Sequence, residues 1–105
     1  MLILDKNVMA KIAKQKAEKA LLLLPSLEVR LDSLKPLAAE IGFCESGVHW
    51  KFAFDNFLLA QGNIAKINRS EPHGCPLSCI DSANYELDML EKLAVRIDYH
   101  KRNAA

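Results

Sequence analysis

The sequence predicts an all-α protein, a compact bundle of about four helices that forms a single helical domain over residues 1–105. Apolar residues recur at spacings of three and four along three long stretches, which is the period of a helix with one buried face. Glycine and proline are sparse, with four of each in the chain, so connecting loops should be few. Half of the residues are apolar, which excludes a disordered chain.

The first predicted helix begins after Asp5, which is a suitable N-cap, with Leu4 and Met9 placed to close a hydrophobic staple. A stripe of small and apolar residues follows, and it would let a neighbouring backbone come close. Its members are Ala10, Ala13, Ala17, Ala20 and Leu24. Pro25 should end this helix, because the residue before a proline avoids the helical region.

The segment at residues 26–32 has two equal interpretations. Leu27, Val29 and Leu31 alternate with charged residues, which is the period of a strand. A short strand here could pair with residues 1–4, although two short strands alone are marginally stable. The alternative is an extra helical turn over the same segment.

Two further helices are predicted in the middle of the chain. A short one begins at Ser33 as N-cap, has Pro36 in its first turn and ends at Gly42. A long one covers residues 46–68 and is apolar around most of its circumference, which predicts a central position. Its core seam is Ala53, Phe57, Ala60, Ile64 and Ile67. Its opposite side is Lys51, Asp55, Gly62, Lys66 and Arg69.

The last helix is predicted to run from a capping box of Ser78 and Asp81 to about Arg102. Its core seam is Ala83, Leu87, Leu90, Ala94 and Ile97. The residues expected to face water are Asn84, Asp88, Glu91, Asp98 and Arg102.

Charge and cysteine content limit the classes of function. Fourteen basic and thirteen acidic residues give a net charge of +1, so no overall basic field would draw the chain to nucleic acid. Three cysteines are an odd number, which favours a reducing, cytoplasmic location over a disulfide framework. The longest apolar run covers residues 20–24 and is far too short to span a bilayer.

A cluster of possible metal ligands precedes the last helix. His73, Cys75 and Cys79 lie within seven residues and offer the imidazole and thiolate groups that zinc prefers. A structural zinc site needs four ligands, and further candidates are His49, His100 and Cys44. The alternative is structural, because a histidine near a helix end often bonds the backbone and a free cysteine often packs like a small apolar group.

A longer spacing carries a family resemblance. His49 is followed three residues later by an aromatic residue, Cys75 begins a Cys-x-apolar step, and His100 follows near the end. Residues 45–105 thereby resemble the chemoreceptor zinc-binding domain, a small helical bundle of bacterial signalling proteins. The resemblance implies that His49, Cys75 and His100 bind zinc inside the bundle.

The chain departs from that family pattern at three positions. Ser78 stands where the family has a glycine, and Ile80 stands where it has an aromatic residue. Ala104 stands where the second histidine of a closing pair is expected, and it cannot bind metal. His73 or Cys79 would therefore have to complete the ligand set.

Residues 37–52 also resemble a helix-turn-helix motif. Its small, turning and apolar positions are Ala38, Gly42, Val48 and Phe52. Such a motif presents the start of its second helix to the major groove of DNA, which makes Ser46, His49 and Lys51 the contact residues. Of these three, Lys51 alone carries a dependable positive charge, whereas phosphate binding needs several basic side chains.

Apolar side chains are also in surplus for so small a body, which favours an interface on its surface. Trp50, Phe54 and Leu58 of the third helix, with Tyr99 of the last, are predicted to contact another protein or a second copy in a homodimer. Trp50 would be the anchor of this contact.

These observations predict a non-enzymatic regulatory or adaptor protein that acts through protein–protein contact. Bound zinc as a stabiliser or switch is the sharper form of this hypothesis, and no other cofactor is expected. The alternative is a helix-turn-helix transcriptional regulator that binds DNA. Enzymatic activity is not expected, because the sequence has no glycine-rich phosphate loop, no dinucleotide fingerprint and no oriented nucleophile–base pair.

Overall fold

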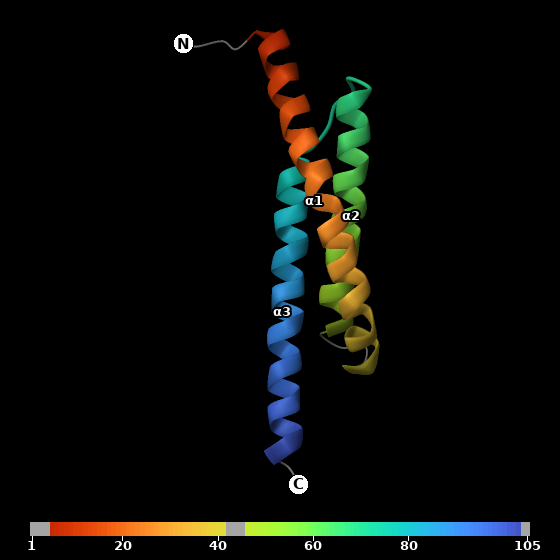
Figure 1. Ribbon diagram of the computed structural model, residues 1–105, viewed down its shortest axis with the longest axis vertical. Helices are drawn as coiled ribbons and strands as arrows, with labels where there is room; N and C mark the ends of the chain where they lie inside the picture. Colours follow the sequence, from red (N-terminus) through yellow and green to blue (C-terminus); the bar gives the residue numbers. More distant parts are fainter. Residues whose placement is uncertain (1–4, 42–45, 104–105) are drawn as a thin grey trace.

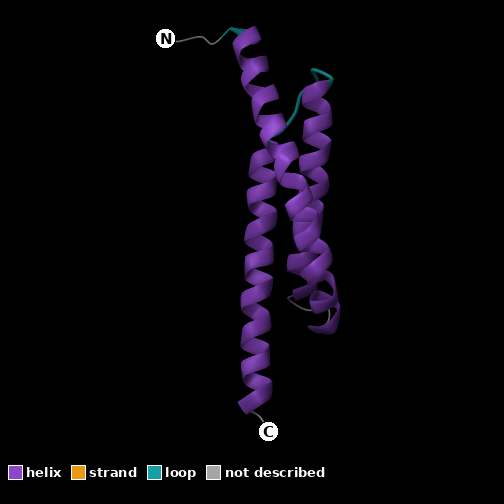
Figure 2. Ribbon diagram, in the orientation of Figure 1, coloured by secondary structure: helices purple, strands orange, loops and turns teal. Residues whose placement is uncertain are grey.

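The computed structural model describes residues 5–41 and 46–103, and within them the side chains of residues 5–39, 48–96 and 98. Three helices and no strand are present in this part of the chain (Figures 1 and 2). The helices are α1 (Lys6–Ile41), α2 (Ser46–Asn68) and α3 (Pro76–Asn103). The all-α prediction is confirmed, whereas the expected number of about four helices is too high.

The bundle is longer than it is wide. α1 and α3 run in the same direction and α2 runs back along them (Figure 1). The molecule measures 64 × 28 × 20 Å and has a radius of gyration of 17.7 Å, whereas a compact chain of this length would have about 13 Å. The predicted compact shape is therefore wrong. Its cause is visible in Figure 1, where the start of α1 and the end of α3 extend past their neighbours at opposite ends.

α1 takes the place of the two helices that were predicted before residue 42. It continues through Pro25 and Pro36, although a proline inside a helix costs about 3 kcal/mol. Both prolines are exposed, so water can reach the carbonyl groups that they leave without a helical partner. A buried stripe runs past both of them at helical spacing: Leu24, Leu27, Leu31 and Ala38, none more than 7% exposed. The packing of this stripe outweighs the local effect of the prolines.

Residues 26–32 are helical, so the predicted strand is wrong and the helical alternative is confirmed. Leu27 and Leu31 are each 2% exposed, while Val29 between them is 65% exposed. A strand would have placed all three side chains on one face. Burial at every fourth residue is what a helix produces.

The start of α1 agrees with the sequence. The Asp5 carboxylate accepts a hydrogen bond from the Asn7 N–H at 3.2 Å, so Asp5 is the N-cap. Leu4, the predicted staple residue, lies outside the described residues. Ser33 does not cap a second helix: it lies inside α1, where its hydroxyl donates to the Val29 carbonyl oxygen at 2.8 Å.

A Schellman motif ends α2 and turns the chain towards α3. Ser70 has a φ of 57°, in the left-handed region. The Glu71 N–H donates to the Lys66 carbonyl oxygen at 2.9 Å, and the Ser70 N–H donates to that of Ile67 at 3.1 Å. These bonds satisfy carbonyl groups at the end of the helix that would otherwise lack donors.

α3 begins earlier than the capping box of Ser78 and Asp81 predicted. Pro76 is its first residue, a position where proline has no hydrogen bond to lose and its fixed φ suits the helix. Cys75 precedes it, and the Cys75 carbonyl oxygen accepts from the Cys79 N–H at 3.3 Å. Cys75 is therefore the N-cap residue of α3.

Alanine residues occupy the centre of the core. Ala20, Ala53, Ala60 and Ala83 are all 0% exposed and come from all three helices. Small side chains at these points let the helix backbones approach closely. The predicted seam of the third helix is buried throughout, and in the last helix Leu87 is 0% exposed. The remaining large core residues are Leu24, Leu27, Leu31, Phe57, Ile64, Ile67, Ile80 and Leu90.

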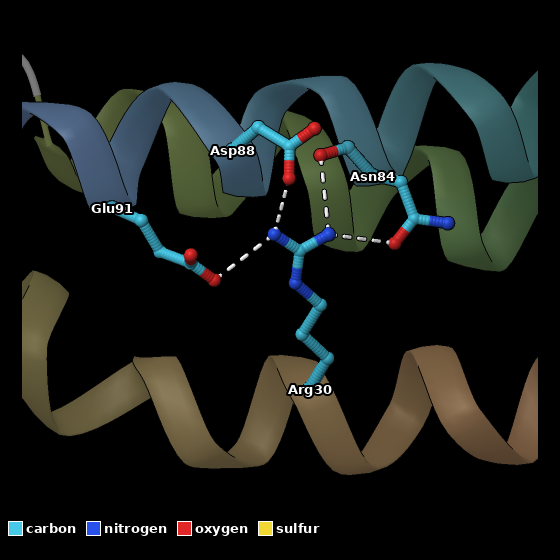
Figure 3. A network of polar contacts seen from close by, with 4 residues as sticks. All are labelled: Arg30, Asn84, Asp88 and Glu91. Carbon is cyan, nitrogen blue, oxygen red and sulfur yellow. Dashed lines mark hydrogen bonds and ion pairs between the residues drawn. The ribbon is translucent and has the colours of Figure 1, made fainter.

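Arg30 joins α1 to α3 through four hydrogen bonds (Figure 3). Its guanidinium donates to the Asn84 side-chain oxygen at 2.9 Å and to the Asn84 carbonyl oxygen at 3.3 Å. It also donates to Asp88 at 2.5 Å and to Glu91 at 2.9 Å. Burial disfavours the charged guanidinium, but the bonds to both carboxylates outweigh it and raise the pKa of Arg30. Asn84, Asp88 and Glu91, predicted to face water, therefore belong to the contact between α1 and α3.

Replacing Pro25 with alanine should raise the free energy of unfolding by about 1–3 kcal/mol, because alanine restores an N–H that can bond the Leu21 carbonyl group. Urea unfolding followed by circular dichroism measures the change. Pro72→Ala, in the loop before α3, is the matched control and should bring no gain. A loss of stability in Pro25→Ala would contradict a helix that is continuous through this position.

Replacing Arg30 with methionine should lower the free energy of unfolding by about 1 kcal/mol, because methionine keeps the packing of the stem and loses the ion pairs. The same substitution should cost less in an Asp88→Asn, Glu91→Gln background, where most of the charge-assisted bonding is already absent. Chemical denaturation of the four proteins measures both values. Equal losses in the two backgrounds would show that the ion pairs contribute nothing.

Candidate functional site

The zinc ligands implied by the family resemblance lie far apart. His49 is in the first turns of α2, and its Nδ1 lies 2.6 Å from Glu86 Oε2 on α3. Cys75 lies beyond the other end of α2, past about 28 Å of helix. His100 follows Glu86 by about 21 Å along α3, in the direction away from Cys75. Its side chain, like Cys44, lies outside the described residues.

The local ligand cluster is also not assembled into a metal centre. The exposed His73 has its Nδ1 at 2.8 Å from the Gly74 carbonyl oxygen, and Cys79 accepts a hydrogen bond from the Asn63 amide at 3.7 Å. Among the described residues, no three His, Cys, Asp or Glu side chains gather in a group that could hold a metal ion. These contacts correspond to the structural alternative for both residues.

The segment that resembles a helix-turn-helix joins two long helices. α1 and α2 have 36 and 23 residues and lie alongside each other as a hairpin (Figure 1). The turn at residues 42–45 lies outside the described residues, as does the Ser46 side chain. His49 faces α3 through Glu86, whereas Lys51 is exposed. Of the predicted DNA contacts, the described side chains of His49 and Lys51 therefore do not share one open face.

Trp50, the predicted anchor of the interface, lies in the contact between α1 and α2. Its indole N–H donates to the Leu31 carbonyl oxygen at 2.9 Å. Its ring stacks on Phe54 with 5.3 Å between centroids, and Lys35 Nζ lies 5.7 Å from its centroid. Of the predicted interface residues, Phe54 is 37% exposed and Leu58 is 47% exposed. The Tyr99 side chain lies outside the described residues.

The side of α2 that is turned away from the bundle carries more exposed apolar surface than the predicted interface. We call this side the outer α2 face. Its residues are Val48, Phe52, Asp55, Leu58, Leu59, Gly62 and Lys66. Phe52 is 51% exposed and Leu59 is 57% exposed. At about 100° per residue, this face lies opposite the buried seam of α2.

A groove of about 410 Å³ runs along the centre of the outer α2 face. Its lining residues are Asp55, Leu58, Leu59, Gly62, Asn63 and Lys66. Gly62 is one of the lining residues, and a Cβ added there would have no atom within 4 Å. The groove is therefore a notch that results from a missing side chain, with an acidic residue at one end and a basic residue at the other.

The sequence did contain a signal for this face. Six positions are spaced four, three, four, three and four residues apart, which is a second heptad seam on the side opposite the core seam. They are Val48, Phe52, Asp55, Leu59, Gly62 and Lys66. Sequence reasoning placed Asp55, Gly62 and Lys66 on the side opposite the core seam and took this apolar helix to be central. Leu59 was therefore missed as a contact residue.

A second pocket, of about 360 Å³, lies between the start of α1, the end of α2 and the loop before α3. Met9 and Ile12 are among its lining residues on α1, and Cys75 lines it from the loop before α3. The backbone N–H and the hydroxyl of Ser78 lower the pKa of the exposed Cys75 thiol, while burial acts against them. The Leu77 N–H and the positive charge of Lys16 act in the same direction as Ser78.

Comparisons of this chain with known proteins found no matching family model, no matching curated protein and no matching solved structure. Within the described residues, no helix has an apolar stretch that could cross a membrane. The resemblance of residues 45–105 to the chemoreceptor zinc-binding domain rests on its motif residues alone.

Cys75 should be alkylated by iodoacetamide faster than Cys79 at neutral pH, with an apparent pKa below the ordinary value of about 8.5. Since folding lowers this pKa, the thiolate adds stability at pH values above the unfolded pKa, and this stability is lost as pH falls through the folded pKa. Ser78→Ala should raise the pKa and slow the reaction of Cys75 at neutral pH. Timed alkylation with peptide mass spectrometry measures the rates, and an unchanged rate in Ser78→Ala would contradict the role of the hydroxyl.

Proposed function

We propose that this chain is a non-enzymatic regulatory or adaptor protein that acts through protein–protein contact, and that the outer α2 face is the contact surface. The observation that carries the proposal is the exposure of four large apolar side chains on one side of one helix. They are Val48, Phe52, Leu58 and Leu59, each between 40% and 57% exposed. Apolar surface that is contiguous and rimmed by polar groups is typical of interaction sites.

The physical gain from covering this face is large enough to drive association. Full burial of a Leu or Phe side chain is favourable by about 1.5–3 kcal/mol, and these side chains are roughly half-covered already. Their helix is held by a buried seam on its other side, so little order has to be created on binding. Asp55 and Lys66 supply charged groups at the edge of the apolar surface, which favour specificity over non-specific aggregation.

The outer α2 face is favoured over the predicted surface around Trp50 because of how the two are covered. Trp50 is half-buried, its N–H is already bonded to Leu31, and Lys35 lies over its ring. Leu59 has no such cover. The zinc form of the hypothesis and the DNA-binding alternative gain no support from the placement of His49, which pairs with Glu86 on α3.

Photo-crosslinking tests the proposal directly. A photoreactive phenylalanine analogue in place of Leu59 should give crosslinked protein products in cells that express the chain. The matched control carries the same analogue in place of Val95 on α3, which is 71% exposed and lies outside the outer α2 face. Mass spectrometry of the products identifies what the face contacts, including a second copy of the chain. Equal or smaller yields from Leu59 than from Val95 would contradict the proposal.

A further inference from the structure

We infer that the part of the outer α2 face from Asp55 to Lys66 binds a second copy of this chain, with the two α2 helices antiparallel and centred between Ala60 and Gln61. This inference rests on the proposed function, since it names the partner of the same surface. It makes the contact isologous, so that each copy offers the same residues to the other across a two-fold axis.

The groove has the symmetry that such a contact requires. Its lining residues form three pairs that are equally distant from the point between Ala60 and Gln61: Asp55 with Lys66, Leu58 with Asn63, and Leu59 with Gly62. A two-fold axis through this point brings each position of one helix to the height of its counterpart in the second copy. The groove is thereby placed on itself with no position left over.

The central pair is complementary in shape. Leu59 is 57% exposed, the largest exposed fraction among the apolar side chains of this face. Gly62, on the same seam, has no side chain and leaves open space beside it. In the antiparallel arrangement Leu59 of each copy enters the notch at Gly62 of the other, as a knob enters a hole. Both notches are filled by one docking event.

The outer pair is complementary in charge. Asp55 and Lys66 are both exposed, and Asp55 forms no ion pair within the described residues. The antiparallel arrangement places Asp55 of each copy opposite Lys66 of the other, which gives two ion pairs. A parallel arrangement would instead place Asp55 opposite Asp55 and Lys66 opposite Lys66, which is unfavourable. Charge therefore selects the direction of the second helix.

One other antiparallel register also pairs opposite charges. It is centred at Ala53 and places Lys51 opposite Asp55 of the second copy. That register leaves Gly62 beyond the overlap of the two helices, so its notch stays unfilled. The register centred between Ala60 and Gln61 satisfies both shape and charge, and we assign the contact to it.

The contact is short, and this sets its strength. The two α2 helices overlap over residues 53–68 of each copy, which is about 24 Å of helix. Stable interfaces bury about 1,200–2,000 Å² of surface in total. One helix pair of this length is expected at the low end of that range. The dimer is therefore expected to be weak and to depend on protein concentration.

A charge-reversal series tested by sedimentation equilibrium decides the question. The full chain is purified and measured under reducing conditions, so that the exposed Cys75 cannot crosslink the copies. Asp55→Lys and Lys66→Asp should each weaken the dimer by roughly tenfold or more, because each places two like-charged pairs in the interface. The double variant, Asp55→Lys with Lys66→Asp, should restore it. A mixture of the two single variants should form a heterodimer that neither forms alone.

Two further variants separate the register from general charge effects and from misfolding. Lys51→Asp is the matched control and should leave the dimer unchanged, since Lys51 has no opposite charge in the assigned register. Gly62→Leu should abolish the dimer by filling the notch. It should not impair folding, because leucine has a higher helix propensity than glycine and its Cβ meets no atom within 4 Å. Circular dichroism and thermal unfolding check the fold of every variant.

The outcomes distinguish this inference from the proposed function. A chain that stays monomeric at all measured concentrations, or a dimer that survives both Gly62→Leu and Asp55→Lys, overturns the second copy as the partner. Crosslinking from Leu59 to a different protein would then leave the proposed function intact. Loss of the dimer in Lys51→Asp with none in Lys66→Asp overturns the assigned register. Recovery of the dimer in the mixture of single variants supports both partner and register.

Discussion

The close approach of three helix backbones at alanine residues is the constraint on which the rest of the molecule depends. Ala20, Ala53, Ala60 and Ala83 are completely buried, and a larger side chain at such a closely packed position generally costs stability. A core this narrow covers one side of α2 and leaves the opposite side to solvent. Because α2 is apolar around most of its circumference, that opposite side retains large apolar side chains. The exposed surface is thus a consequence of how the core is built.

Small side chains let helices pack closely but specify their axial register weakly. Three polar contacts between the helices specify this register. Each contact joins a different pair of helices. Arg30 bonds α1 to the carboxylates of α3, His49 pairs with Glu86 between α2 and α3, and the Trp50 N–H bonds the Leu31 carbonyl group between α2 and α1. No buried side-chain nitrogen or oxygen of the described residues lacks a partner. Polar groups that are satisfied in only one alignment fix the sliding position of each helix pair.

The sequence predicted what depends on short-range periodicity and missed what depends on distant partners. The α2 seam, the positions Ala83, Leu87 and Leu90 of the α3 seam, and the Asp5 cap follow from spacing and capping chemistry. Each depends on residues that are close together in the sequence, so each could be predicted from it. The path of α1 through Pro25 could not, because the stripe that outweighs the proline gains its energy from packing against α2 and α3.

The candidate site shows the same division. The partner of His49 lies 37 residues away in the chain, so no local pattern indicated that its ring would face Glu86. The cover over Trp50 comes from α1, whose course through this region had been assigned to a strand or a separate helix. Leu59 belongs to a second heptad seam, but the apolar circumference of this helix predicted a central position, with Trp50, Phe54 and Leu58 as its surplus apolar residues.

The uneven burial along α1 has a consequence for the chemistry at the far end of the bundle. Every described side chain before Ala13 is exposed, and the first buried one is Ala17. The opening turns of α1 therefore fray at little cost in free energy, while Ala20 and the residues beyond it open only with the whole domain. Met9 and Ile12 line the pocket beside Cys75, so fraying of the first turns of α1 removes this side of the pocket. The pocket beside this exposed thiol thus loses one wall on local unfolding, while the domain as a whole stays native.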